Sequence, residues 1–438
     1  MVLDLVNLTL GGLAVILAAL AVLLSACGHR PDAMAPNLDL AAESYVRLVL
    51  ALGERDSDSL DSYHGPPAWQ VEARARLATL VDIQTAAASL GESLATSTAV
   101  GDERRRMFLV RQLRAIVTRI DILRGRRPPF AEETRALFGV DVRGDDDTAA
   151  VSVRADIDRL LPGRGDLTAR YAVFDRKSLI APDRLGPVLA RAIQGCRVAT
   201  RAHLTLPSAE RVDVQFVHDL PWSAFTRYQG AYASRIQVNT AMPLTVDRAL
   251  DLACHEGYPG HHTIDSLLEA TFGGRVEFLV RPLFSPQSLL HEAASSLAAS
   301  LAFSDAARLA FERDELFPLA GLDPADADRH VRIGRLVDQL HVVQADIARR
   351  YLDGELDFPR AAMTFERDAL MPSADATLKF LNQYRTYAAT YTVGRDQVSR
   401  YLDARARRHG GDDDKWRAYA ELITNPTQMA PSEAAARR

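Results

Sequence analysis

The sequence predicts a mainly α-helical protein that contains one small β region, and three observations support this fold class. Several long segments place apolar residues at the spacing of a single helix face. One segment near the middle of the chain instead alternates apolar and polar residues. A helix follows it and ends in the stretch HEGYPGHH, residues 255–262. The chain has 438 residues, of which 47% are hydrophobic, so it can bury a large core.

The helix prediction rests on three segments, residues 103–125, 183–204 and 326–352. In the first, apolar residues recur at the i, i+3, i+4 and i+7 positions that form one helix face, and arginines occupy the other face. The residues on the apolar face are Leu109, Leu113, Ile116, Val117, Ile120 and Leu123. The other two segments follow the same pattern, so each is predicted to be a helix.

The β prediction rests on two short segments ahead of the histidine-rich stretch. Residues 211–220 alternate apolar and polar side chains, which is the period of a half-buried strand. After a loop that contains tryptophan and tyrosine, residues 233–243 alternate in the same way. Pro243 ends this strand because proline has no N–H to donate to a neighbouring strand. Thr245 can then cap a helix over residues 246–258.

The N-terminal segment has the composition of a secretory signal. Residues 8–27 form an apolar run that is short for a membrane-spanning helix with its flanks. Residues 24–27, Leu-Ser-Ala-Cys, resemble a bacterial lipobox, where a diacylglyceryl group is attached to the cysteine, and residues 28–37 would form a polar tether. An uncleaved membrane helix is the alternative, because the first seven residues contain Asp4 and no basic residue. Both interpretations place the body of the protein outside the cytoplasm, and the first anchors it in the cell envelope by a lipid on Cys27.

Composition argues against several functional classes. The formal net charge is −5, which favours neither nucleic acid nor an anionic membrane surface as a partner. The chain has no G-x-S-x-G motif and no glycine-rich phosphate loop, which argues against a serine hydrolase and a nucleotide enzyme. Apart from Cys27 the cysteines are Cys196 and Cys254, and the sequence leaves open whether they pair. It also leaves the oligomeric state open.

The stretch HEGYPGHH begins like the zinc-binding motif H-E-x-x-H, but Pro259 stands where the second histidine is expected. In H-E-x-x-H a regular helix presents two histidines one turn apart, with the glutamate between them. At about 100° per residue, His261 points away from the face of His255, and His262 returns to that face about two turns along. Proline disfavours helical geometry at Tyr258, so we predict a break that could bring either histidine back towards His255.

A proline-glycine turn with incidental histidines is the alternative interpretation of this stretch. Three features favour a metal site instead. Three of the 11 histidines of the chain fall within residues 255–262. A strand precedes the stretch, as in zinc peptidases whose edge strand holds the substrate backbone. Residues 288–303 then form an apolar helix in which Glu292 lies among small residues that would let the helix approach closely.

The stretch LACHEGYPGHHT, residues 252–263, resembles the H-E-x-x-P-G-H-H signature of the bacterial family catalogued as domain of unknown function 885. That family includes many lipoproteins and zinc peptidases of the glutamate-zincin type. Three further segments are similar to its sequence elements: DSYHGPP at 61–67, YQGAYASRIQVNTAMPL at 228–244 and YRTYAATYTVG at 384–394. The resemblance covers most of the mature chain and implies a two-lobed helical zinc-peptidase-like fold.

The resemblance implies a zinc ion held by His255, Glu292 and one further histidine, with Glu256 as the general base. We predict His261 as the second ligand, because Gly260-His261 matches the Gly-His that ends the motif of thimet oligopeptidase and of angiotensin-converting enzyme. His262 is the alternative ligand; in that case His261 would orient a ligand through a hydrogen bond.

Other residues are candidates for binding substrate or stabilising the transition state. Tyr387 and Tyr391 are similar to the tyrosines that face the zinc in thimet oligopeptidase, and at i and i+4 they share one helix face. Arg385 is a candidate for a substrate carboxylate, and Asn239, on the predicted edge strand, for a substrate backbone. Asp265, Glu269 and His291 rank lower as candidates for holding the metal ligands in place. The simpler interpretation is that these last three residues are solvated or cap helices.

Together these features predict five segments. They are a lipoprotein signal peptide at 1–27, a tether at 28–37, an N-terminal helical lobe at 38–205, a catalytic region with the small sheet and the metal-binding helices at 206–430, and a disordered tail at 431–438. The predicted function is extracytoplasmic, zinc-dependent hydrolysis of peptide bonds. The alternatives are a zinc amidohydrolase acting on a non-peptide amide, such as a cell-wall fragment, and a non-catalytic binding lipoprotein.

The lipid anchor can be tested by metabolic labelling with a palmitate analogue. We expect the wild-type protein to incorporate the label and Cys27→Ser to incorporate none, because the thiol is the attachment point. Labelling that survives the substitution would reject the lipoprotein prediction, and so would recovery of the wild-type protein in the cytoplasm.

Overall fold

The computed structural model describes residues 37–76, 78–97, 102–142, 148–372, 374–409 and 411–425. The predicted signal peptide, Cys27 and the tail at 431–438 lie outside these residues. The fold is mainly α-helical, as predicted, with a small β region directly before the helix that carries His255. Among the described residues, none of the helices combines the length and the apolar character that crossing a membrane requires.

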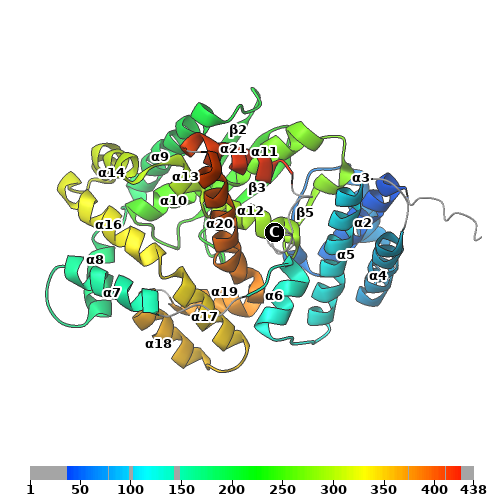
Figure 1. Cartoon of the computed structure of the whole chain (residues 1–438), viewed down its shortest axis with the longest axis horizontal. Coiled ribbons are helices and arrows are strands. Elements are labelled where there is room, and N and C mark those ends of the chain that lie inside the picture. The colour runs from blue at the N-terminus through cyan, green and yellow to red at the C-terminus, as the bar shows by residue number, and fades with distance from the viewer. Residues whose placement is uncertain are drawn as a thin grey trace, which may run out of the picture.

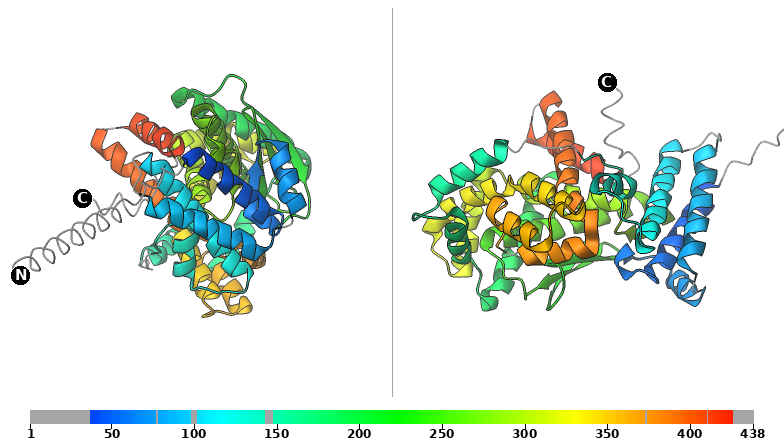
Figure 2. Two further views of the ribbon diagram at one scale, coloured as in Figure 1. Left: turned by 90° about the vertical axis from the view of Figure 1, so that its right-hand side faces the viewer. Right: turned by 90° about the horizontal axis from the view of Figure 1, so that it is seen from below.

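Four helices gather at one end of the molecule (Figure 1, Figure 2). They are α2 (Leu38–Gly53), α3 (Pro67–Arg76), α4 (Leu80–Thr96) and α5 (Glu103–Leu123). Their starts follow local rules: Asn37, Thr79 and Asp102 each accept hydrogen bonds from the free backbone N–H groups of the first turn. The predicted helix over 103–125 is confirmed as α5, whose apolar face packs into a core with α2 and α4.

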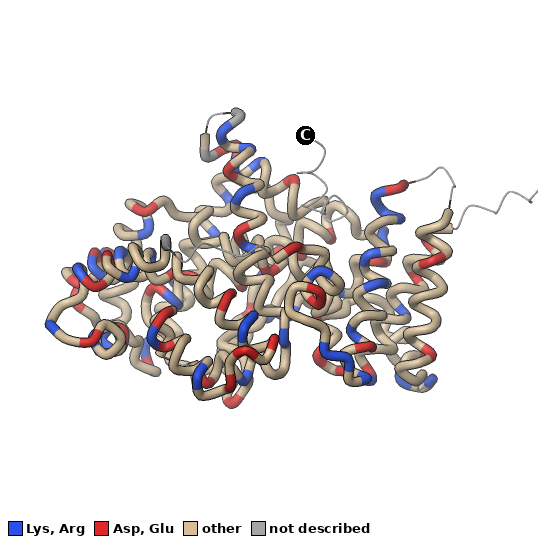
Figure 3. The backbone as a smooth tube through the Cα atoms, turned by 60° about the horizontal axis from the view of Figure 1, so that its bottom comes forward, with Lys and Arg blue, Asp and Glu red and all other residues tan. Residues whose placement is uncertain are grey.

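The remaining helices form the rest of the molecule. They are α6 (Phe130–Phe138), α7 (Thr148–Leu160), α8 (Leu167–Arg176), α9 (Pro182–His203), α10 (Val246–Glu256), α11 (His261–Phe272), α12 (Pro286–Ser295), α13 (Ala298–Ala302), α14 (Asp305–Phe311), α15 (Phe317–Ala320), α16 (Ala327–Asp338), α17 (His341–Leu352), α18 (Phe358–Asp368), α19 (Ala374–Tyr384), α20 (Val393–His409) and α21 (Asp412–Ile423). Short 3₁₀ turns lie at Ser57–Ser59, Val276–Phe278, Pro324–Asp326 and Arg385–Thr390, and a π-helical turn at Glu312–Leu316. Basic and acidic residues are interspersed along these helices (Figure 3).

The predicted helix over 183–204 is confirmed as α9, but the single helix predicted over 326–352 is wrong. The structure has two helices there, α16 and α17, which are separated by a turn at Gln339 and Leu340. Leu340 is fully buried in a core that α16 forms with α7 and α8. A continuous apolar period cannot reveal this turn, because both helices keep the same spacing and neither proline nor glycine marks the boundary.

Three strands form the sheet that precedes α10. Strands β2 (Arg211–Val217) and β4 (Ala233–Asn239) run parallel, and β3 (Ala224–Gly230) pairs with β4 in the antiparallel direction, so the order is β2-β4-β3. Two of these strands were predicted, but β3 was taken for a loop. The prediction that β4 is an edge strand is therefore wrong, because β3 covers its other side. Residue Asn239 lies at the end of the central strand.

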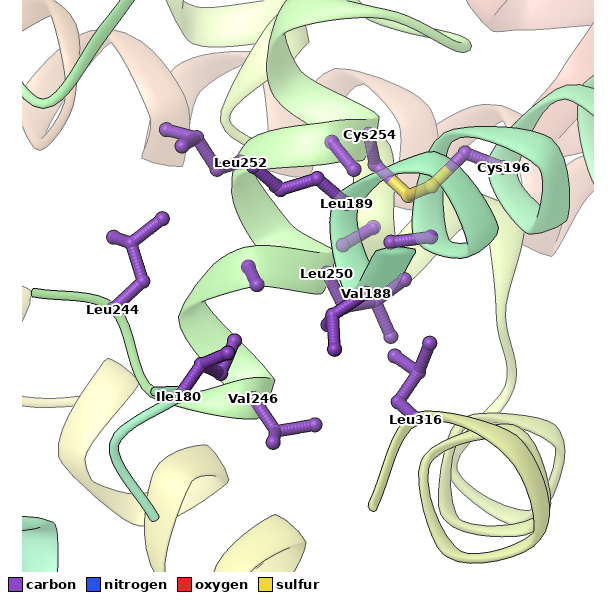
Figure 4. Close-up of a cluster of buried hydrophobic side chains, with 14 of the residues drawn as sticks. Ile180, Val188, Leu189, Cys196, Leu244, Val246, Leu250, Leu252, Cys254 and Leu316 are labelled. Carbon is purple, nitrogen blue, oxygen red and sulfur yellow. A yellow bond between two sulfur atoms is a disulfide. The ribbon is translucent and has the colours of Figure 1, made fainter. Parts of the chain in front are cut away.

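A second, two-stranded sheet joins distant parts of the chain. Strand β1 (Leu60–Tyr63) pairs in the antiparallel direction with β5 (Val280–Pro282). Apolar packing is also continuous across the predicted domain boundary at residue 205. One core contains Val188 and Leu189 of α9 together with Leu250 of α10 (Figure 4).

A disulfide between Cys196 of α9 and Cys254 of α10 lies within this core (Figure 4). The two cysteines are 58 residues apart in sequence, and both are fully buried. Closing a loop of that length stabilises a folded chain by about 4 kcal/mol, mainly by restricting the unfolded state. Because Cys254 directly precedes His255, the cross-link also fixes the end of α10 against α9.

Candidate metal centre

The chain breaks where the sequence predicts a break. Helix α10 ends at Glu256, and α11 begins at His261, so His255 closes one helix and His261 opens the next. The Tyr258–Pro259 peptide bond in the turn is cis. Gly260 lies so close to the end of α10 that a Cβ atom there would be 1.8 Å from the carbonyl oxygen of His255. Only glycine fits at this position.

The break brings the two histidines together over one carboxylate. His255 Nε2 lies 3.3 Å from Glu292 Oε2, and His261 Nε2 lies 3.3 Å from Glu292 Oε1. The candidate ligand atoms of the three residues all lie within 4.8 Å of one another. Glu292 is supplied by α12, so three helices contribute one residue each. His255, His261 and Glu292, all predicted as ligands, are therefore neighbours in the structure.

The donor set matches what a transition-metal ion requires. Two imidazole nitrogens and one carboxylate are a common set of three protein ligands for catalytic zinc, with a further position left open. Glu292 is 7% exposed, and its Oε2 has no hydrogen-bond partner. Burial opposes charge on this carboxylate, but His261 and His255 hold its pKa well below the usual range. A buried, ionised oxygen without a hydrogen bond fits a metal ligand.

His262, the alternative ligand, points to a different group of residues. Its Nδ1 lies 2.8 Å from Ser234 Oγ, and its Nε2 lies 3.1 Å from Glu210 Oε2. Glu210 also accepts hydrogen bonds from Tyr258 and Arg197. Burial works against ionising Glu210, but the hydrogen bonds from His262, Tyr258 and Arg197 lower its pKa to about 2. With both ring nitrogens engaged, His262 holds the turn against β4 and is not placed to bind the metal.

Glu256 lies next to the candidate ligands and is 5% exposed. The hydroxyl of Thr226, on strand β3, lies 2.7 Å from Glu256 Oε2 and 2.9 Å from the carbonyl oxygen of Glu256. One carboxylate oxygen is thus held by the sheet. Nothing in the sequence singles out Thr226, because the segment that forms β3 was not recognised as a strand.

Tyr387 and Tyr391 both approach the same carboxylate. The hydroxyl of Tyr387 donates a hydrogen bond of 2.8 Å to Glu292 Oε1. The ring of Tyr391 lies 5.7 Å from that of Tyr387 and 6.2 Å from that of His255. Tyr387 belongs to a 3₁₀ turn that ends just before Tyr391, so the predicted α-helical face is wrong although both rings reach the site. Burial, reinforced by Glu292, raises the pKa of both phenols, which therefore remain protonated donors.

Asn239 and Arg385 have partners within the protein. The amide of Asn239 donates to the carbonyl oxygens of Leu220 and Trp222, at 2.8 and 3.0 Å. The guanidinium of Arg385 donates to the carboxylate of Glu133 through Nε and Nη2. These bonds close a loop and anchor a turn. In the structure both side chains are therefore engaged in contacts within the protein.

Of the three lower-ranked candidates, one has only structural contacts and the other two share a buried partner. Glu269 binds the hydroxyl of Tyr228 and the backbone N–H of Ala231, so it is structural. Asp265 and His291 instead meet at Arg281, a buried arginine that the sequence analysis missed. Burial lowers the pKa of His291 to about 3, so this imidazole is neutral. The sequence feature that could have indicated this residue is an arginine within the apolar run FLVRPLF at 278–284. A charge in such a run is expected to be buried and to need a partner.

Three solved structures are similar to this chain. A putative lipoprotein from Colwellia psychrerythraea has 13% identity and a TM-score of 0.49, with 81% of this chain and 65% of that chain covered. An M32 carboxypeptidase from Deinococcus radiodurans R1 has 16% identity and a TM-score of 0.47, with 89% and 88% covered. A putative lipoprotein of unknown function from Shewanella oneidensis has 13% identity and a TM-score of 0.43, with 82% and 75% covered.

No protein-family model matches the chain, and no curated protein sequence matches it either. The chain spans 65% of the length of the Colwellia protein. At these identities and TM-scores the likeness concerns the general helical arrangement alone.

The choice between His261 and His262 can be tested by metal analysis of purified variants. We expect His255→Ala, His261→Ala and Glu292→Ala each to lose stoichiometric metal, because each removes one of three protein ligands. His262→Gln should retain the metal, because its hydrogen bonds go to Ser234 and Glu210. Retention of metal by His261→Ala together with loss by His262→Gln would reverse the assignment.

Proposed function

We propose that this protein is a zinc-dependent peptidase whose metal is held by His255, His261 and Glu292. The observation that carries the proposal is the meeting of two imidazoles and one buried carboxylate, with a second carboxylate, Glu256, in the adjoining position. This combination of ligands and base is what metal-assisted hydrolysis of an amide requires. When bound, zinc would supply Lewis acidity towards the scissile carbonyl and towards water.

Glu256 would act as the general base of this reaction. The hydroxyl of Thr226 holds Oε2, which leaves Oε1 as the oxygen that accepts a proton from the attacking water. The same carboxyl group then returns the proton to the leaving amine. Its position at the last residue of α10, directly after His255, keeps the base within reach of the ligand cluster.

Tyr391 would stabilise the negative charge that develops on the carbonyl oxygen. Its hydroxyl is a neutral donor, because burial and Glu292 raise the pKa of the phenol. Both phenols interact with Glu292, but the ring of Tyr391 also lies 6.2 Å from that of His255, whereas the hydroxyl of Tyr387 donates to Glu292 Oε1 at 2.8 Å. We therefore assign Tyr391 to the substrate and Tyr387 to orienting Glu292.

An extended peptide would pair with strand β3, an edge of its sheet, through the backbone of Ala224, because the carbonyl oxygen of Thr226 already accepts a hydrogen bond from Arg281. The carbonyl oxygen of Ser223 accepts a hydrogen bond from Asn239 N, so the backbone of the next residue, Ala224, faces away from β4. The side chain of Thr226, two residues further along, contacts Glu256. A substrate that paired with this edge would pass the base, and we place the role first assigned to Asn239 on the backbone of β3.

The location that fits this proposal is the cell envelope, with a lipid on Cys27 as the anchor. A buried disulfide is typical of proteins that fold in an oxidising compartment. The motif at 252–263 and the segments at 61–67, 228–244 and 384–394 support a relationship to the family catalogued as domain of unknown function 885.

The role of Glu256 predicts a clean separation of metal binding from turnover. We expect Glu256→Gln to bind zinc as the wild type does and to lose about 10²–10⁴ in kcat, since the amide keeps the shape but cannot accept the proton. Peptide and muropeptide libraries assayed side by side provide the measurement. Cleavage of muropeptides alone would favour the amidohydrolase alternative, and a wild type without stoichiometric zinc would favour a binding lipoprotein.

The role of Tyr391 predicts a loss of rate when only its hydroxyl is removed. We expect Tyr391→Phe to lose about 10²–10³ in kcat, with zinc content and melting temperature nearly unchanged, because phenylalanine keeps the ring. Tyr387→Phe is the matched comparison and should have a smaller effect. Unchanged turnover in the double variant would show that both tyrosines are structural.

A further inference from the structure

Two of the helices that carry candidate ligands, α11 and α12, meet at one buried guanidinium, that of Arg281 on strand β5. This side chain is 4% exposed. Its Nη1 lies 2.8 Å from Asp265 Oδ2 and 3.0 Å from His291 Nδ1. Its Nη2 donates to the carbonyl oxygen of Thr226 at 3.3 Å, and its Nε donates to Asp61 Oδ2. Four segments of the chain therefore converge on one side chain.

Three of the partners of Arg281 either lie near a candidate ligand on the same helix or contact the base. Asp265 lies on α11 one turn after His261, and His291 precedes Glu292 on α12. Because Arg281 can only donate, His291 Nδ1 accepts, and the ring orientation beside Glu292 is fixed. Thr226 links the same guanidinium to the base, because its hydroxyl contacts Glu256 Oε2.

The fourth partner comes from the N-terminal part of the chain. Asp61 lies on β1, which pairs with β5. The whole residue is 8% exposed, so its carboxylate is buried. Asp61 and Asp265 flank Arg281 on different sides and compensate its charge. The N-terminal segment thereby reaches the centre through Asp61, although Asp61 lies about two hundred residues before His255 in the sequence.

This geometry calls for arginine in particular. A guanidinium presents its donors in a rigid planar fork, whereas the ammonium of lysine is a compact charge on a flexible stem. Buried ion pairs of this kind are weak evidence for stability, because the cost of removing the charges from water offsets much of their attraction. The arrangement is better explained by the placement of the groups that it joins.

We propose that Arg281 is a positioning residue, which sets the placement of His261 and Glu292 relative to one another and, through Thr226, the placement of Glu256. Asp61 holds Arg281 in register, so the centre is complete only when β1 is paired with β5. The part that concerns Glu256 rests on the proposed peptidase function. The part that concerns the metal ligands does not.

The first experiment measures zinc affinity by competition with a chelator, using the full-length protein. We expect Arg281→Lys to bind zinc about 10- to 100-fold more weakly than the wild type, which is the size of effect typical of residues that support metal ligands from outside the ligand set. Arg281 would act through Asp265 and His291, which lie on the helices that carry His261 and Glu292. Arg119→Lys is the matched control. Arg119 is also buried and paired with a carboxylate, that of Asp56 at 2.8 Å, but none of its recorded contacts is with a residue of α11 or α12, the helices that carry His261 and Glu292. It should keep wild-type zinc affinity even if its melting temperature falls.

The second experiment isolates the link to the base. Thr226→Val keeps the shape of the side chain and removes the hydroxyl, so zinc affinity should be unchanged. The value of kcat should fall about 10- to 100-fold with KM nearly unchanged, because a misplaced reacting group costs that much. Thr226→Ser restores the hydroxyl and should recover most of kcat, which a purely structural role of the threonine methyl group would not allow.

The outcomes separate the two proposals. Wild-type zinc affinity in a folded Arg281→Lys protein would overturn the positioning role, whatever the enzyme hydrolyses. Weakened affinity in Arg281→Lys but not in Arg119→Lys would support it, even if no peptide were cleaved and the peptidase proposal failed. Should Arg281→Lys not fold, Asp61→Asn keeps the arginine and the shape of its partner, and the same loss of zinc affinity is expected.

Discussion

The candidate metal centre depends on the close approach of Gly260 to the end of α10. The backbone N–H of Gly260 donates a 3.0 Å hydrogen bond to the carbonyl oxygen of Cys254, so the chain folds back over the last turn of the helix. Any side chain at position 260 would collide with the carbonyl oxygen of His255. Because of this turn, a histidine six residues after His255 can face the same carboxylate. An uninterrupted helix could not bring His261 there.

The surroundings of the turn hold it in place from several sides. The hydroxyl of Tyr419 donates to the carbonyl oxygen of Pro259 at 2.8 Å, and the hydroxyl of Tyr258 donates to Glu210. His262 links the same glutamate to β4, and the disulfide at Cys254 fixes the other end of the motif. Four residues separate Glu256 from His261, two more than in H-E-x-x-H. The resulting turn is held by buried polar contacts that a regular helix would not need. Removing one partner from a buried ion pair typically costs about 3–5 kcal/mol.

The parts of this site that the sequence predicted are those encoded by residues close together in the chain. His255, Glu256 and the break at Pro259 are encoded within a few residues, and Glu292 is recognisable as an acid on an apolar helix. Arg281 and Thr226 are not recognisable in this way, because their roles arise from contacts between segments far apart in the chain. The internal partners of Arg385 and Asn239 were not predicted for the same reason: Glu133 and the loop before β3 are not evident from spacing. Strand β3 was missed because its apolar residues alternate imperfectly between two sheet faces.

The balance of buried charge explains why a cation is favoured at this centre. Four carboxylates lie in or beside it, those of Asp61, Glu256, Asp265 and Glu292, against the single guanidinium of Arg281. Burial opposes protonating His261, but Glu292 raises the pKa of that imidazole, so a proton can relieve part of the excess negative charge. Buried carboxylates without sufficient counter-charge are costly unless they bind a metal or take up protons. A divalent cation between His255, His261 and Glu292 would compensate two of these charges at the point where the ligand atoms already converge. The arrangement of Arg281 has a second consequence: its single positive charge offsets one of the two negative charges of Asp61 and Asp265, and neither Glu292 nor Glu256 is among its hydrogen-bond partners, so a cation at the ligand atoms is still required.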